Sequence, residues 1–365
     1  MEIRVNRSEF LGELIPMQGI VERKTTIPVL SHLLLTARGD QLYLAATDLD
    51  VSLTSECDAD IKREGGIAVQ AKKLVEIIRS LTSDDVHLVQ EEPRVLTIRA
   101  GKSRFKIHGL SPDDFPTLPT VEDNRQVEIP FTDFRRMVAK ILFAVSAEES
   151  RFQLNGALLK LKNGSLEMVA TDGHRLALVE GGLEGSGEED SVLVPRKALQ
   201  ELQRLEGEGN LAYRRGEHHL SFKLGNRELI CRILEGTFPD YERVIAKDND
   251  KKILFNRKQL SEAVQRAALM TGDRARAVRL QFGSDQLVVS AANPDLGDAT
   301  EEVACDYDGP EFRLGINPDY LAQWLSAVET EKVRLELKDE NTQCVGYPQD
   351  GPDTRYLCVI MPMRI

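Results

Sequence analysis

The sequence predicts an α+β protein built from three similar domains, because three patterns recur in the same order along the chain. The first is a proline that ends an apolar run, at the evenly spaced positions Pro116, Pro239 and Pro362. The second is a run of small residues followed by aspartate or asparagine, at 44–53, 168–178 and 288–298. The third is an amphipathic segment, at 69–81, 192–205 and 314–328. These patterns place the domains at 1–122, 123–248 and 249–365, each long enough to bury its own core.

The first helix of each domain follows a capping residue. The middle copy is the clearest, since the apolar residues of 133–145 recur at helical spacing after Thr132. The corresponding helices are expected at 7–15 after Asn6 and at 257–270 after Asn256. Pro16 is expected to end the first of these helices or to kink it.

Strands and a second helix complete each domain. Alternating apolar residues predict strands at 41–46, 165–170 and 286–291. Apolar residues at helical spacing predict the second helices at 72–81, 195–205 and 318–328, the last of them capped by Asn317. Polar segments at 120–126 and 246–252 are expected to link the domains.

Composition excludes several classes of protein. With 41% hydrophobic and 29% charged residues, the chain has the balance of a soluble protein, and it contains no apolar run of membrane-spanning length and no signal-peptide pattern. The five cysteines are scattered without metal-ligand spacing, which argues against structural zinc and a disulfide framework and indicates a reducing, cytoplasmic compartment. No metal or cofactor is expected.

Positive charge concentrates on the expected helices although the net charge is −12. Acidic residues gather in loops such as 185–190 and 295–308. Basic helical faces on an acidic protein suit sequence-independent contact with DNA phosphates. The helical cations selected by spacing are Lys73, Arg136, Lys140 and Arg266. The alternative is that lysine and arginine simply solvate the helices.

Several segments resemble the bacterial DNA polymerase III beta subunit, the sliding clamp, along the whole length of the chain. They are 26–30 (TIPVL), 170–176 (ATDGHRL), 194–197 (VPRK), 238–241 (FPDY) and 359–365 (VIMPMRI). The resemblance implies the DNA clamp fold, in which each domain packs two helices on antiparallel sheets and two subunits join head to tail in a ring. It also implies a replication processivity factor that encircles duplex DNA without sequence specificity and has no catalytic residues. The implied partners are the clamp loader, the replicative polymerase and repair polymerases, which bind through short peptides.

The resemblance carries three sets of site residues onto this chain. The DNA contacts would be Lys24, Arg151, Phe152, Arg196 and Lys197. The dimer interface would include Phe105, Ile107, Leu269 and Met270. The partner-peptide cleft would comprise Leu154, Thr171, Gly173, His174, Arg175, Leu176, Pro239, Arg243, Val244, Asn317, Tyr320, Val359, Met361, Pro362, Met363 and Arg364. Its methionines could re-pack around different peptides, and its arginines could bind peptide carbonyls. Ala275 stands where family members carry an aromatic residue, so one side pocket is expected to be wider or shallower.

Two other functions are compatible with the residues alone. Asp172 and His174 could form an acid–base pair of a hydrolase, although neither of the other two domains repeats that pair and no nucleophile accompanies it. The three-domain chain could also be a protein scaffold that never meets DNA. Retention on circular DNA distinguishes a clamp from both.

Overall fold

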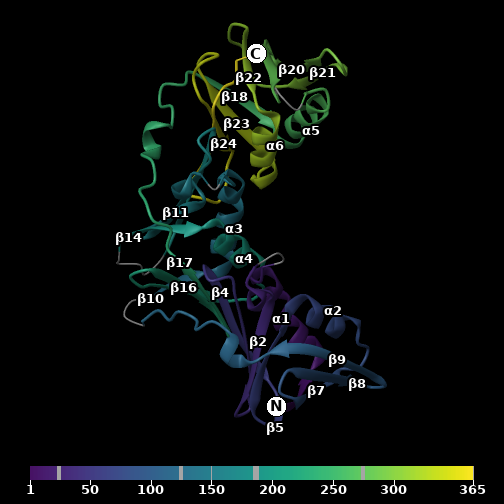
Figure 1. Cartoon of the computed structure of the whole chain (residues 1–365). Helices are drawn as coiled ribbons and strands as arrows, with labels where there is room; N and C mark the ends of the chain where they lie inside the picture. The colour runs from purple at the N-terminus through teal and green to yellow at the C-terminus, as the bar shows by residue number, and fades with distance from the viewer. Residues whose placement is uncertain (23–25, 123–125, 149, 184–188, 273–275, 365) are drawn as a thin grey trace. The chain divides into compact units, whose positions relative to one another are not determined.

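The computed structural model describes residues 1–22, 26–122, 126–148, 150–183, 189–272 and 276–364 (Figure 1). The chain forms two compact units. Unit 1 contains residues 1–134 and 197–233, and unit 2 contains residues 135–196 and 234–365. The chain passes from one unit to the other within the third helix, α3 (Phe131–Ile141), and at the start of the fourth, α4 (Arg196–Arg204).

Unit 1 contains one antiparallel sheet of 13 strands, in the order β10-β15-β16-β17-β4-β3-β2-β6-β9-β8-β7-β1-β5. Helices α1 (Arg7–Ile20) and α2 (Ala71–Ser80) pack against each other, and α1 also lies on β3 and β4. The strands are β1 (Glu2–Asn6), β2 (His32–Arg38), β3 (Gln41–Thr47), β4 (Val51–Asp58), β5 (Asp60–Arg63), β6 (Gly65–Gln70), β7 (Asp85–Glu92), β8 (Val95–Ala100), β9 (Ser103–Leu110), β10 (Gln126–Pro130), β15 (Asn210–Arg215), β16 (His219–Leu224) and β17 (Arg227–Arg232).

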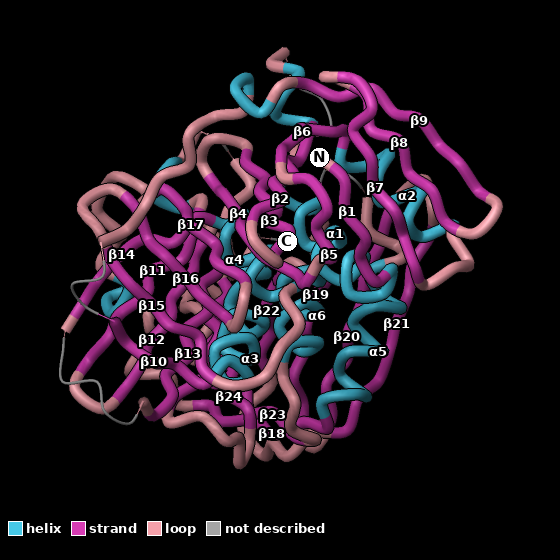
Figure 2. Tube along the Cα trace, turned by 90° about the horizontal axis from the view of Figure 1, so that it is seen from below, coloured by secondary structure: helices cyan, strands magenta, loops and turns pink. Residues whose placement is uncertain are grey.

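Unit 2 contains an eight-stranded sheet, β14-β11-β12-β13-β25-β24-β23-β18, and a four-stranded sheet, β21-β20-β19-β22. Helix α5 (Arg257–Ala268) packs on β20 and β21 and against α6 (Pro318–Ala327) (Figure 2). The strands are β11 (Gly156–Lys162), β12 (Ser165–Thr171), β13 (Arg175–Gly182), β14 (Asp190–Pro195), β18 (Lys251–Asn256), β19 (Val278–Gly283), β20 (Gln286–Asn293), β21 (Gly297–Ala304), β22 (Phe312–Ile316), β23 (Lys332–Leu337), β24 (Cys344–Pro348) and β25 (Arg355–Ile360).

The predicted helices and strands are present, and the three predicted asparagine caps are confirmed. Thr132 is not a cap, because α3 begins at Phe131 and contains it. The side chain of Asn6 accepts hydrogen bonds from the backbone N–H groups of Ser8 and Glu9 at the start of α1. Asn256 and Asn317 cap α5 and α6 in the same way. The α+β class is therefore confirmed, and asparagine capping marks helix starts in both units.

Of the two outcomes expected at Pro16, an end of the first helix is wrong, because α1 continues to Ile20. Proline lacks the N–H that would bond to the carbonyl four residues earlier, which here belongs to Gly12. That carbonyl instead accepts a hydrogen bond from Nη2 of Arg227, at 3.4 Å. The same guanidinium binds both carboxylate oxygens of Glu13 at 2.8 Å. A side chain from β17 therefore supplies the donor that Pro16 removes.

The internal repeat is also visible in one turn. In the first copy, Oδ1 of Asp48 accepts hydrogen bonds from the N–H groups two and three residues later. In the second copy, Oδ1 of Asp172 does the same. The residue after each aspartate has a positive φ, 82° at Leu49 and 88° at Gly173. Glycine adopts this conformation without strain, whereas leucine does not.

Candidate functional site

The second copy of this turn lies beside the junction of β13 and β25 in unit 2. Leu176 pairs with Val359 across these antiparallel strands. Beyond the end of β25, the N–H of Met361 donates to the carbonyl of His174 at 2.9 Å, and the N–H of Met363 donates to the carbonyl of Gly315 at 2.9 Å. These bonds hold the tail against both β13 and β22, so the structure brings together predicted site residues that are distant in sequence.

An apolar cluster lies beneath the tail. It contains Leu176 and Val359 together with Tyr241 and Ile245, and Val244 packs against it. Leu176 and Val359 are almost fully buried, whereas Met361 is 36% exposed. A buried apolar layer next to a mobile thioether side chain at the surface is suited to receive apolar side chains of a peptide.

Arg175 holds this region together rather than facing solvent. Its Nε donates to Oδ2 of Asp172 at 3.0 Å, and its Nη1 donates to Oε1 of Gln323 at 2.6 Å. Its Nη2 donates to the carbonyl of Phe143. The guanidinium also lies 4.4 Å from the ring centre of Tyr320. The expectation that Arg175 would bind peptide carbonyls does not fit this geometry, because these donors already have partners and the residue is only 9% exposed.

Two aromatic side chains form one wall of the region. His174 and Tyr320 stack with ring centres 6.5 Å apart. Burial raises the pKa of the Tyr320 hydroxyl above its usual value, so this group stays a neutral donor. Asn317 lies one turn earlier, where its side chain accepts from the N–H of Asp319 and fixes the start of α6.

The remaining predicted peptide-site residues differ in their surroundings. Leu154 is buried, whereas Pro239 is exposed. Arg243 is exposed and pairs with Asp240 at 2.7 Å. Arg364 is exposed and makes no hydrogen bond or ion pair with the residues that the structure describes. Arg364 is thus better placed than Arg175 to meet a ligand.

Sequence reasoning missed the residues that hold the side chains of this region in place. Gln323 lies three residues after Tyr320, so helical spacing could have placed both on one face of α6. The carbonyl of Phe143, which accepts from Arg175, gave no signal in the sequence. The hydroxyl of Tyr241 donates to the buried carboxylate of Glu167. Burial is the main cause that raises the pKa of Tyr241, and this hydrogen bond is the second.

The predicted DNA contacts at the start of α4 are already engaged within the chain. In unit 1, Lys197 donates to the carbonyl of Ile20 at 2.6 Å and pairs with Asp48. In unit 2, Nη1 of Arg196 lies 3.5 Å from the carbonyl of Ser146. Either side chain would bind a DNA phosphate only by sharing these internal contacts with it or by giving them up.

Residues 151–152 present one partly buried contact and one exposed ring. Nη1 of Arg151 donates to the carbonyl of Asp172 at 2.9 Å, so this arginine supports the turn that carries His174. Phe152 is 70% exposed. Lys24 lies outside the described residues.

The helical cations selected by spacing are engaged in ion pairs. Lys73 pairs with Glu76 at 2.7 Å, and Arg266 pairs with Glu301 at 2.6 Å. Lys140 is the clearest departure from expectation, because its side chain is 3% exposed and its ammonium lies 2.6 Å from Asp353. A buried cation with a buried partner cannot contact DNA, so helical spacing was misleading here. Arg136 lies 3.6 Å from Asp353.

Two apolar surfaces coincide with the predicted dimer residues. Phe105 and Ile107 lie on β9, which pairs with β8 along its length but, in the described part of the chain, meets β6 only at residues 109–110. Phe105 is 36% exposed. Leu269, just after α5 in unit 2, is 73% exposed and is followed by the half-buried Met270. Ala275 lies outside the described residues.

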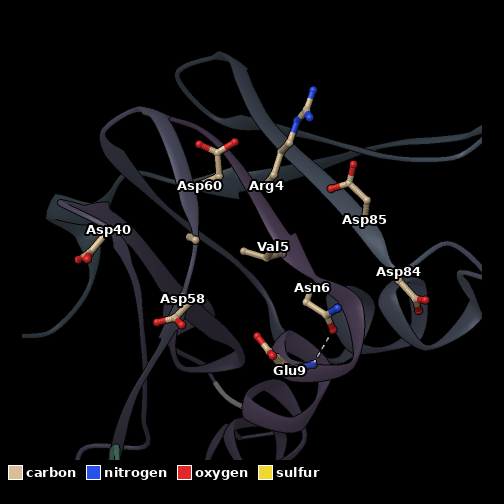
Figure 3. Close-up of a pocket in the computed structure, with 10 residues that line it drawn as sticks. Arg4, Val5, Asn6, Glu9, Asp40, Asp58, Asp60, Asp84 and Asp85 are labelled. Carbon is tan, nitrogen blue, oxygen red and sulfur yellow. Dashed lines mark hydrogen bonds between the residues drawn. The ribbon is translucent and has the colours of Figure 1, made fainter.

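A cavity of about 690 Å³ in unit 1 shows where negative charge gathers (Figure 3). Its acidic lining residues are Glu9, Asp40, Asp58, Asp60, Asp84 and Asp85, with Arg4 as the basic member. Figure 3 shows the carboxylates spread around the cavity. Among the described residues, no three His, Cys, Asp or Glu side chains are arranged so that they could hold a metal ion. Six carboxylates around one arginine make this lining predominantly acidic.

Three domain models of one protein family match the chain in order. They are the N-terminal, central and C-terminal domains of the DNA polymerase III beta subunit, which match residues 1–119, 128–240 and 242–364. This chain belongs to the DNA polymerase III beta subunit family. The central family domain contributes strands to both compact units, because β17 continues the sheet of the first domain and β13 that of the third.

Relatives of the family agree over their full length. The beta sliding clamp of Pseudomonas aeruginosa is 37% identical, and that of Caulobacter vibrioides 35%, each with 100% of both chains covered. A solved sliding clamp of Pseudomonas aeruginosa bound to griselimycin has a TM-score of 0.93 at 36% identity, covering 100% of both chains. The beta subunit of Thermotoga maritima has a TM-score of 0.94 at 26% identity and covers 100% of this chain and 99% of its own.

Proposed function

We propose that this chain is the processivity factor of DNA replication, a sliding clamp that encircles duplex DNA and tethers DNA polymerase III. The observation that carries the proposal is the match of all three beta-subunit domains, in order, along the chain. Two copies would join head to tail, with the open edge of β9 of one copy facing the region after α5 of the other. A closed ring holds DNA topologically, so its phosphate contacts can stay weak enough for sliding.

Partners would bind at the junction of β13, β25 and α6. The buried apolar cluster there, with Met361 at its surface, supports a hydrophobic site for short peptides of the replicative polymerase, repair polymerases and the clamp loader.

DNA would contact the protein through Arg196, Lys197 and the exposed Phe152, with Lys73 and Arg266 as weaker contributors. We assign the protein to the cytoplasm, where the chromosome of a bacterium lies. In the described part of the chain, no helix has the length and apolar character needed to cross a bilayer.

The chain is not an enzyme, as the family is a non-catalytic processivity factor. The geometry at Asp172 also disfavours an acid–base pair. Its carboxylate accepts from the backbone N–H of His174 and from the Arg175 side chain, while the ring of His174 stacks on Tyr320. A carboxylate occupied in this way serves as a turn former rather than as a catalytic base.

Loading on circular DNA tests the proposal. The protein is loaded onto nicked circular DNA by a competent clamp loader, the circle is linearised, and retention on DNA is measured. We expect the protein to be retained on circles and lost after linearisation, because only a closed ring is held topologically. Retention that linearisation does not change would contradict the ring, and no association with circles would favour a scaffold.

A second test addresses partner binding. We expect deletion of residues 361–365 to abolish binding of polymerase peptides and to leave the dimer intact, since the deletion removes the tail above the apolar cluster. Binding is measured by fluorescence anisotropy and the dimer by sedimentation velocity. Undiminished peptide binding would place the partner site elsewhere on the protein.

A further inference from the structure

A cavity of about 510 Å³ lies in unit 2 where the tail crosses β22. Three arginines line it, from β19, from β22 and from the tail, with one glutamate from the turn after β23. The lining residues are Arg279, Arg313, Leu314, Gly315, Glu340, Asn341 and Arg364. The cavity is thus predominantly cationic in a chain whose net charge is −12.

The strand register places two of these arginines on one face of the four-stranded sheet. Arg279 pairs with Gly315, and Gln281 pairs with Arg313. Arg279 and Arg313 are therefore diagonal neighbours on the same face, and Gly315, opposite Arg279, has no side chain to separate them. Like charges at this spacing repel each other, so the arrangement is unfavourable without a counter-charge.

No carboxylate within the described residues, Glu340 of the lining included, forms an ion pair with the three arginines. Arg279, Arg313 and Arg364 make no hydrogen bond or ion pair there. Other arginines of unit 2 have such partners, since Arg276 pairs with Asp319 at 2.8 Å and Arg355 pairs with Glu242 at 2.8 Å. Guanidinium groups that converge without partners are suited to bind carboxylates.

The cavity adjoins the tail of the proposed partner site. The hydrogen bond from Met363 to Gly315 joins the tail to β22 at the cavity wall, and Arg364 follows directly. A peptide bound over Met361 and Met363 would therefore have one end next to the arginines. Because the cavity lies next to the proposed peptide site, a carboxylate of a bound peptide is favoured over a DNA phosphate as its ligand.

We propose that this arginine cavity binds an acidic segment that flanks the apolar motif of partner peptides. The inference rests on the proposed function, because the apolar motif would be held at the partner site. Partners with aspartate or glutamate beside the motif would bind more tightly than partners with neutral flanks, so the cavity would rank competing partners by charge.

Fluorescence anisotropy with paired peptides tests the inference. A synthetic peptide with the clamp-binding segment of the replicative polymerase carries Asp-Asp-Glu or Asn-Asn-Gln, placed at either end in separate peptides. We expect wild-type protein to bind one acidic-flank peptide about five-fold more tightly than its neutral counterpart at low salt, and high salt to reduce the difference. R279Q/R313Q should bind both peptides equally, with unchanged affinity for the neutral peptide.

Matched variants separate local from general charge effects. K252Q/K258Q removes two exposed lysines of unit 2 outside the cavity and should keep the preference. R279E/R313E should instead prefer a Lys-Lys-Lys flank. Arg364 is left unchanged because it also belongs to the proposed partner site.

Each contrary outcome has a distinct meaning. A preference that survives in R279Q/R313Q, or equal binding of both peptides by wild-type protein, overturns the inference and leaves the proposed function intact. Failure of wild-type protein to bind any of the peptides overturns the proposed partner site and the inference with it. Weaker retention of R279Q/R313Q on circular DNA without any effect on peptides would assign the arginines to DNA phosphates instead.

Discussion

Replacing Lys140 with methionine should strongly destabilise unit 2 and leave DNA retention unchanged. The ammonium of Lys140 lies 2.6 Å from Asp353, and the two side chains are only 3% and 2% exposed. Methionine keeps most of the aliphatic volume and removes the charge. The carboxylate of Asp353 would then remain buried with Arg136, at 3.6 Å, as a cationic neighbour.

The magnitude follows from the asymmetry of the pair. Removal of one partner of a buried ion pair costs about 3 kcal/mol, because Arg136 at 3.6 Å compensates the buried Asp353 carboxylate only in part. For a cooperative unit of about 150–250 residues this corresponds to a fall in Tm of roughly 9 °C. D353N should cost less, about 1–2 kcal/mol, because Lys140 keeps Glu329 at 3.1 Å.

Urea unfolding and calorimetry of the full chain measure these differences. K258M is the matched control, because Lys258 is exposed and its carboxylate partner Glu262 lies at 3.8 Å, and it should change stability by less than about 0.5 kcal/mol. The double variant K140M/D353N should cost less than the sum of the single changes. Equal stability of K140M and wild type, or a larger loss in D353N than in K140M, would refute the reasoning.

Three further changes test other parts of the structure. R227Q should cost about 3 kcal/mol of unfolding free energy by urea titration, because it strands the buried carboxylate of Glu13; a loss below 1 kcal/mol would contradict this. The pKa of Tyr241 is raised in the fold, so the folded state holds its proton more tightly, and stability should fall as pH rises above the ordinary value of 10. Y241F should weaken that fall and cost about 1 kcal/mol at neutral pH by leaving Glu167 without this donor; an unchanged pH profile would contradict it. G173A should cost about 1 kcal/mol, because φ is 88° there, and weaken peptide binding; unchanged affinity would detach the turn from the partner site.

The proposed partner site shows which features of a site can be predicted from sequence and which cannot. The resemblance selected Leu176, Val359 and Met361, and the structure brings these residues together through strand pairing and one apolar cluster. It also selected Arg175, whose donors turn out to be occupied by neighbours that include Gln323. A motif marks which residues matter in a family, but it does not say whether a side chain contacts the ligand or supports the residue that does.

The three-fold repeat, the helices with their asparagine caps, and the family could all be predicted from the residues alone. Those features depend on neighbours within a few residues, because helical and strand periodicities and capping bonds are local. The continuation of α1 through Pro16 could not be predicted in this way, since the compensating donor is Arg227 from β17. The burial of Lys140 against Asp353 could not be predicted either. Charge pairing and burial join residues far apart in the chain, and no local pattern specifies the partner.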